Sequence, residues 1–306
     1  MTAQWTERKE AGGKFALRFI RWLALHASRR LAGATLYPIT LYFLLVRSLE
    51  RRASRNYLRR ALGREPTLFD IARHIHTFAA TILDRVYLLS GRFQAQRIRV
   101  HGREIVHQYL DRGQGVLLLG SHLGSFEVVR VVGLSRPEVV VRVLMDYGHN
   151  RRLAAMLDAL NPRAAQSLID AAEDSTRVLL RMHETLDAGG LMGMLGDRMH
   201  AAEPVVQCQF FGEPVEFPTS PWRIAAVLKA PVVLIFGLLR PSGEYDVYFE
   251  SFAEQIILPR NQREEQGRMW AQRYAQRLEH YARQAPFNWF NFYDFWGDER
   301  KGERKK

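Results

Sequence analysis

Apolar positions from residue 66 onward follow two alternating periods. Over 66–93 they recur every three or four residues, at Leu68, Ile71, Ile75, Phe78, Ile82 and Val86, which predicts a helix. Apolar runs at 97–102, 115–120, 138–145, 191–195, 231–240 and 245–251 predict strands. Helical spacing occupies 103–113, 125–134, 150–162, 174–190, 217–230 and 261–286. This alternation predicts an α/β fold, a sheet with helices on its faces.

Residues 31–46 form a run of 16 residues without a charged side chain, with arginines on both flanks. As one helix the run would span about 24 Å, shorter than the roughly 30 Å hydrocarbon core of a bilayer, and Pro38 would kink it. Residues 14–30 alternate basic and apolar side chains around Trp22, as interfacial helices do. We therefore expect residues 1–65 to form a hydrophobic helical membrane anchor, either a short tilted span or a helix pair in the interface. Two buried helices of a soluble domain are the alternative.

The charge balance favours an acidic partner. The formal net charge is +12, and residues 1–66 hold 14 Lys and Arg but only four Asp and Glu. An anionic membrane or an acidic carrier protein fits this excess, whereas no element interleaves basic and aromatic residues as nucleic-acid binders do, so no nucleic acid is expected. Cys208 is the only cysteine, which excludes an intrachain disulfide and a cysteine-based zinc site. The basic residues 297–306 are expected to form a disordered tail.

Polar side chains follow the expected strands, which is where sites form in open α/β sheets. His122 follows the strand at 115–120, and Asp197 and Arg198 follow a later strand. Glu127 opens the helix after His122, so its carboxylate can turn back to one ring nitrogen and raise the basicity of the other. The pair would act as a general base towards a nucleophile supplied by the substrate. The alternative is a favourable first-turn acid beside an ordinary loop histidine.

Several neighbouring residues are candidates for binding substrate. Gly124 and Ser125 lie in the loop after His122, where a glycine lets substrate approach the backbone and amides at a helix start can face an oxyanion. Arg223, one turn into a later helix, either binds a phosphate or pantetheine group or lies on the surface. No metal is expected, because the chain contains no H-E-x-x-H motif, and it also lacks the G-x-S-x-G and P-loop motifs.

The segment GSHLGSFE at 120–127 resembles the H-x4-[DE] motif of the lysophospholipid acyltransferase superfamily. The order of the surrounding segments is similar to that of the late acyltransferases of lipid A biosynthesis, which use H-x4-E. GLMGMLGDRM resembles the family's segment ending in Asp-Gln, the stretch 209–240 resembles F-F-G-x-P followed by a helix, and APFNWFNFYDFW resembles the aromatic closing segment. Together with the basic hydrophobic N-terminus, the resemblance covers roughly residues 15–296. It places the acyltransferase domain at 66–296.

The resemblance implies a mixed sheet flanked by helices and, without a cofactor, transfer of a fatty acyl chain from acyl carrier protein or coenzyme A to a hydroxyl or amine of a lipid acceptor. His122 would be the general base, Glu127 its orienting partner and Asp197 a supporting residue. The implied location is the cytoplasmic side of the bacterial inner membrane, where anionic lipid and the acidic carrier protein would attract the N-terminus. Arg198 stands where these enzymes usually have Gln. The acceptor therefore remains open among a lipid A precursor, an aryl-polyene lipid and an amino-acid lipid.

Two other functions remain open on the sequence. A hydrolase would use the same His122–Glu127 pair with water as the acceptor. A non-enzymatic membrane-surface protein would need only the basic N-terminus. The candidates for an apolar slot for the acyl chain are Val128, Val131, Leu144 and Met145, with a plain core role as the alternative. The sequence does not fix the acyl length, the donor or the oligomeric state.

Overall fold

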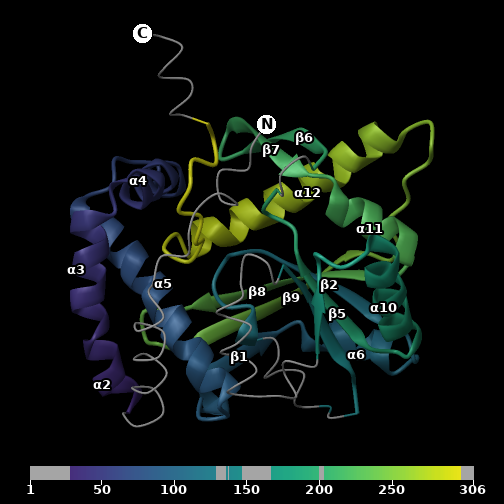
Figure 1. Ribbon diagram of the computed structural model, residues 1–306, viewed down its shortest axis with the longest axis horizontal. Helices are drawn as coiled ribbons and strands as arrows, with labels where there is room; N and C mark the ends of the chain where they lie inside the picture. Colours follow the sequence, from purple (N-terminus) through teal and green to yellow (C-terminus); the bar gives the residue numbers. More distant parts are fainter. Residues whose placement is uncertain (1–27, 129–135, 137, 147–166, 200–202, 298–306) are drawn as a thin grey trace.

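The structure, a computed structural model, describes residues 28–128, 136, 138–146, 167–199 and 203–297 (Figure 1). In these residues the main sheet has seven strands in the order β1-β9-β8-β2-β5-β3-β4, and neighbours are parallel except for β8 and β9. The strands are β1 (Ile98–His101), β2 (Val116–Gly120), β3 (Val141–Met145), β4 (Leu168–Asp170), β5 (Leu191–Leu195), β8 (Val232–Leu239) and β9 (Tyr245–Ala253). The expected mixed sheet flanked by helices is confirmed.

Strand β2 lies at the centre of the sheet, and all five of its residues are buried. Side chains alternate between the two faces of a strand, so each face of β2 joins a different core. Leu117 belongs to the core that includes α12 (Arg263–Gln284), whereas Leu118 belongs to the core that includes α6 (Arg103–Leu110). A strand covered on both faces needs apolar side chains throughout, which explains the uninterrupted apolar run in the sequence.

Two of the expected helices begin with the caps that their sequences favour. In α5 (Leu68–Leu89), Thr67 and Asp70 form a capping box, in which each side chain accepts from the other's backbone N–H. In α10 (Ser175–Asp187), the carboxylate of Asp174 accepts from two N–H groups of the first turn. Polar side chains thus satisfy backbone donors that would otherwise lack partners.

The other expected helices differ in extent. α11 (Ser220–Leu228) begins later than expected, because 217–218 end strand β7 (Glu213–Pro218), which pairs antiparallel with β6 (Val205–Phe210). The helix expected at 150–162 lies outside the described residues. Of the helix expected at 125–134, residues 125–128 are described, and Glu127 and Val128 among them are helical.

Three helices precede α5, namely α2 (Arg29–Ala34), α3 (Leu36–Val46) and α4 (Ser48–Leu62). They pack on α5, which lies between α3 and the sheet in Figure 1. The expected kink lies at Thr35 rather than at Pro38, because Pro38 has no N–H for the Ala34 carbonyl and its ring clashes with that group. Within the described residues no single helix is long and apolar enough to cross a bilayer. The pair Leu31–Val46 and Ser48–Leu62, bent by 95°, meets the length and composition test together.

α3 and α4 expose side chains of contrasting kinds. The apolar edge, as we name it, consists of exposed side chains on and around α3: Leu31, Tyr37, Leu41, Tyr42, Leu45, Val46 and Leu49. On α4, Arg52, Arg55 and Arg59 are exposed at helical spacing, while Ser54 and Tyr57 on the other face are buried. Residues 1–27 lie outside the described part of the chain, so the anchor proposed for 1–65 stays a prediction, as do the 66–296 domain and the 297–306 tail.

The two-stranded sheet β6–β7 packs on α12. Cys208 on β6 is 3% exposed, and this burial raises the pKa of its thiol to about 11. The thiol is therefore a structural group of the core.

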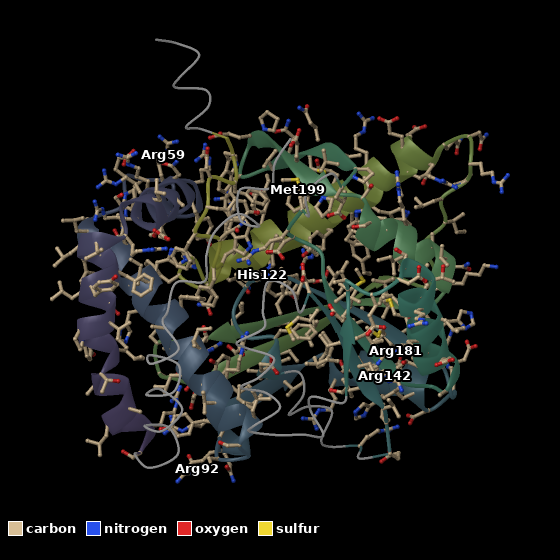
Figure 2. The ribbon with its side chains drawn as sticks, in the orientation of Figure 1. Arg59, Arg92, His122, Arg142, Arg181 and Met199 are labelled. Carbon is tan, nitrogen blue, oxygen red and sulfur yellow. The ribbon has the colours of Figure 1, made fainter. Side chains whose placement is uncertain are left out.

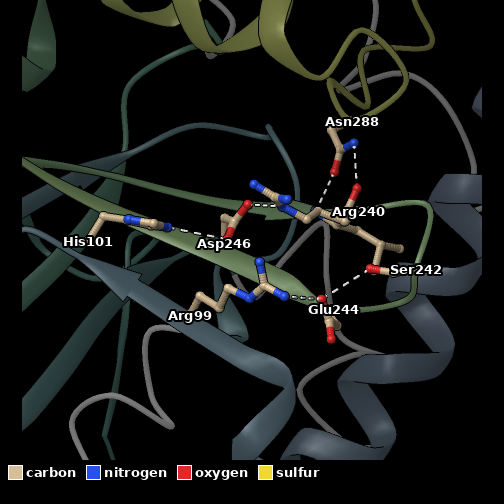
Figure 3. A network of polar contacts seen from close by, with 8 residues as sticks. Arg99, His101, Arg240, Ser242, Glu244, Asp246 and Asn288 are labelled. Carbon is tan, nitrogen blue, oxygen red and sulfur yellow. Dashed lines mark hydrogen bonds and ion pairs between the residues drawn. The ribbon is translucent and has the colours of Figure 1, made fainter.

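Polar side-chain contacts join β1 to β9 and to the turn between β8 and β9 (Figure 3). Arg99 of β1 lies 2.9 Å from Glu244, and His101 lies 3.3 Å from Asp246. Asp246 also contacts Arg240 across the turn. These contacts fix the carboxyl end of β8, on which the candidate site depends.

Candidate active site

The loop after β2 is held by hydrogen bonds at both ends. The Gly120 carbonyl accepts from the Tyr274 hydroxyl at 2.8 Å and from the Gly196 N–H at 3.0 Å. The His122 carbonyl accepts from the Phe290 N–H at 2.9 Å. These bonds hold the backbone of His122 near the centre of the molecule (Figure 2).

Gly124 brings this loop against β8. Its φ is +73°, and a Cβ atom built on it would lie 1.9 Å from the Gly237 carbonyl oxygen. The Gly124 N–H donates to Asn288 O and the Ser125 N–H donates to Gly237 O, each at 2.8 Å. Both amides are therefore already paired within the fold. A role for Gly124 and Ser125 in binding substrate stays a prediction.

Replacing Gly124 with Ala is expected to lower the free energy of unfolding by about 3 kcal/mol. The left-handed backbone conformation costs about 1–2 kcal/mol for a residue with a Cβ, and displacing the Gly237 backbone adds a similar amount. Gly267→Ala in α12 is the control, because its Cβ meets no atom within 4 Å. Urea unfolding should show a lower midpoint for Gly124→Ala only. Equal midpoints for the two variants would contradict the close approach.

Asp197 contacts His122 because their strands are parallel neighbours, so β2 and β5 end at the same edge of the sheet. The Nδ1 of His122 lies 2.8 Å from Oδ1 of Asp197. The other carboxylate oxygen accepts from the His122 N–H and from the Trp289 indole N–H, each at 3.0 Å. Asp197 is 0% exposed, and these bonds supply the partners that a buried carboxylate requires.

The electrostatics fix the protonation of this pair. Burial alone would raise the pKa of Asp197, but His122, Arg198 and Trp289 outweigh it and the pKa is lowered. Burial and the charges of Arg198 and Arg85 lower the pKa of His122, against the raising effect of Asp197. The imidazole is therefore neutral at neutral pH. Since a carboxylate only accepts, Nδ1 carries the proton and Nε2 keeps a lone pair. The side chain is 29% exposed, so Nε2 can accept a proton from a bound group.

Glu127 is buried at the start of its helix, and its Oε1 lies 3.8 Å from Nε of Arg85 on α5. The carboxylate that the structure places on the His122 ring is that of Asp197. Sequence reasoning made Asp197 a supporting residue and gave the orienting role to Glu127. That role of Glu127 stays a prediction, and its pairing with Arg85 brings a cation to the same region.

The other expected residues are divided between the site and its surroundings. Arg198 is partly buried beside Asp197 and donates to the Phe290 carbonyl at 2.7 Å. Arg223 is exposed on α11, which packs on α10 and α12, and the structure does not place it in the His122–Asp197 network.

The described residues proposed for an acyl slot lie in or against core clusters. Val128 is 0% exposed in the core that includes α6. Leu144 and Met145 are partly buried against core clusters, and Val131 lies outside the described residues. The plain core role therefore accounts for the three described positions.

Sequence reasoning missed Arg85 and Trp289. A signal for Arg85 was its place in an apolar helix, where Asp84 and Arg85 interrupt the buried positions Leu83 and Val86. Trp289 was part of the aromatic closing segment, but nothing in the sequence pairs its indole with Asp197. Within the described ranges, no three His, Cys, Asp or Glu side chains gather as metal ligands.

Comparison with known proteins gives one finding on the family. The model of a family described as bacterial lipid A biosynthesis acyltransferase matches residues 69–297. The match includes His122, Glu127, Asp197 and both missed residues. No curated protein matches the chain.

Proposed function

The chain belongs to the bacterial lipid A biosynthesis acyltransferase family, and we propose that it transfers a fatty acyl chain from an acyl carrier protein or coenzyme A thioester to a hydroxyl or amine of a lipid acceptor. The family makes the chain an acyltransferase of lipid biosynthesis. The donor, the acceptor and the roles of individual residues are the proposal.

In the proposed reaction His122 is the general base. Its Nε2 takes the proton from the acceptor hydroxyl as the oxygen attacks the thioester carbonyl carbon. The tetrahedral intermediate collapses by breaking the C–S bond, and the leaving thiolate takes the proton from the imidazolium. No bond to the protein forms. The observation that supports this role is the 2.8 Å contact between Nδ1 and Asp197, which leaves Nε2 free and stabilises the imidazolium.

Two cations are suited to stabilise the negative charge that develops on the carbonyl oxygen. The charges of Arg198 and Arg85 both lower the pKa of His122, so their fields reach the imidazole. An oxyanion formed beside Nε2 would lie in the same fields. In this proposal the charge on the carbonyl oxygen is stabilised by two side-chain cations rather than by the backbone amides of Gly124 and Ser125.

The test is an acyl-transfer assay with purified protein. Radiolabelled acyl carrier protein thioester and a total lipid extract from the source cells are supplied, and the products are separated. A labelled lipid supports acyl transfer and identifies the acceptor. Labelled free acid without labelled lipid would favour the hydrolase. Turnover of neither kind, with acyl coenzyme A also supplied, would favour the non-enzymatic membrane-surface protein.

We further propose that the protein works on the cytoplasmic side of the bacterial inner membrane. The apolar edge offers several large side chains to a bilayer, and the exposed arginines of α4 are suited to anionic headgroups. A lipid acceptor would reach the site from the same surface.

The double substitution Leu41→Glu and Leu45→Glu is expected to weaken binding to anionic liposomes at least about tenfold. Burying one leucine contributes roughly 1.5–3 kcal/mol, and a glutamate is also repelled by anionic lipid. Both leucines are exposed, at 54% and 69%. Leu180→Glu is the matched control, since Leu180 is 58% exposed on α10. Flotation with liposomes measures the bound fraction. Unchanged binding of the double variant would contradict membrane contact through the apolar edge.

A further inference from the structure

The closing segment, residues 288–290, holds three parts of the active site together. The side chain of Asn288 accepts from the Leu239 N–H at 2.7 Å and donates to the Leu239 carbonyl at 3.1 Å, at the end of β8 (Figure 3). The Phe290 N–H donates to the backbone carbonyl of His122, and the Phe290 carbonyl accepts from the Arg198 guanidinium. The segment thus connects β8, the His122 loop and the Asp197–Arg198 loop.

Trp289, at the middle of this segment, is 0% exposed. It forms hydrogen bonds through both its indole N–H and its backbone carbonyl. Its indole N–H donates to Oδ2 of Asp197 at 3.0 Å. Its backbone carbonyl lies 2.9 Å from Nε2 of His74, which projects from α5. One residue therefore joins the carboxylate on the His122 ring to a second buried histidine.

The chemistry of the partners fixes the direction of each bond. A carbonyl only accepts, so Nε2 of His74 carries the proton that it donates to Trp289. Burial lowers the pKa of His74 to about 4, so the ring is neutral and its Nδ1 is an acceptor. The hydroxyl of Ser54 on α4, 2.8 Å from Nδ1, must then donate. The bonds run from Ser54 to His74 to Trp289, and the Trp289 indole then donates to Asp197.

We propose that Ser54, His74 and Trp289 are positioning residues for the general base, holding the Asp197 carboxylate in the orientation that fixes the tautomer of His122. The inference rests on the proposed function for its effect on turnover. Ser54 and His74 are both 0% exposed, so they act on the site through Trp289 rather than by contact with substrate. Buried polar groups that are this fully paired restrict their neighbours to a single arrangement. The inference also gives α4 and α5 a part in the site beyond packing.

The first test is Trp289→Phe, which keeps an aromatic ring and removes the donor to Asp197. We expect kcat to fall about tenfold with KM little changed. The negative charge of Asp197 would then be less neutralised by hydrogen bonding and would stabilise the imidazolium more strongly. The pKa of His122 should therefore rise, and the acid limb of the pH–rate profile should move to higher pH. The other charged groups acting on His122, Arg198 and Arg85, are unchanged. A purely structural role for Trp289 would lower the yield of folded protein without moving this limb.

The second test compares two substitutions of His74. Gln keeps a donor near the position of Nε2, whereas Leu has none, so His74→Gln should retain at least about threefold more of kcat than His74→Leu. His76→Leu is the matched control, because His76 lies on the same helix and its Nδ1 lies 3.2 Å from the Thr40 hydroxyl, away from Trp289. Equal losses in the Gln and Leu variants, in proportion to their loss of thermal stability, would overturn the role of His74.

A readout without turnover separates this inference from the proposed function. The pKa of His122 is measured by NMR on histidine-labelled protein, with His122→Ala to assign the resonance. A raised pKa in Trp289→Phe supports the positioning role even if His122→Ala retains full activity, which would overturn the general base alone. An unchanged pKa in Trp289→Phe overturns the positioning role.

Discussion

His122→Ala is expected to reduce acyl transfer by about 10³-fold while the protein stays folded. General-base catalysis typically contributes 10²–10⁴-fold. The side chain is partly exposed, so its removal leaves little buried space. The rate is measured as labelled lipid formed from the acyl thioester, and folding is checked by circular dichroism and thermal unfolding.

The matched control for this variant is His183→Ala. His183 forms the same kind of contact, with Nδ1 2.8 Å from a carboxylate oxygen of Asp187, but both side chains are more than half exposed on α10. Removing an exposed His–Asp pair should leave the rate within about twofold, because exposed pairs contribute little. Activity of His122→Ala near that of the wild type would rule out the general-base role.

Asp197→Asn is expected to lower kcat by about 10²-fold or more, again with a folded protein. The amide cannot compensate the positive charge that the imidazolium develops, and its NH₂ group can force Nδ1 to accept, which leaves the proton on Nε2. Loss of the carboxylate removes an effect that raises the pKa of His122, so the acid limb of the pH–rate profile should move to lower pH. In the wild type this limb should already lie below pH 6.5, the ordinary value for histidine, because the pKa of His122 is lowered.

Glu127→Gln separates the two carboxylates. Because Glu127 pairs with Arg85, we expect its replacement to alter substrate binding or charge stabilisation and to move the acid limb less than Asp197→Asn does. If Glu127 is the orienting group, the order of the two effects reverses. A pH profile for each variant decides between the assignments, and a profile of Asp197→Asn that matches the wild type would remove Asp197 from the mechanism.

The sequence was informative where a local pattern fixes structure. The continuous apolar run of β2 and the three-to-four-residue apolar spacing of α5 predicted those elements, because burial on both faces of a strand or on one face of a helix depends on neighbouring residues. The edge of the sheet that holds His122 and Asp197 was predictable for a similar reason, since parallel strands end together.

The partner of His122 was not predictable in this way. Glu127 is close in sequence, whereas Asp197 comes close only because β5 pairs with β2, and strand order is a property of the whole sheet. Trp289 reaches Asp197 from a segment 92 residues away along the chain. Bonds of this kind depend on tertiary packing, for which a single sequence carries no periodic signal.

The rate at which a reagent modifies the buried thiol of Cys208 measures how often this part of the molecule opens. A thiol reagent attacks the thiolate, and a pKa of about 11 together with burial under α12 keeps that form scarce and covered in the native state. Because there is one cysteine, every modified molecule reports the same event: departure of the β6–β7 ribbon from the helix that also supplies Tyr274 to the end of β2. The labelling rate with and without lipid or acyl thioester would therefore measure how far ligands tighten this half of the fold, with no engineered probe.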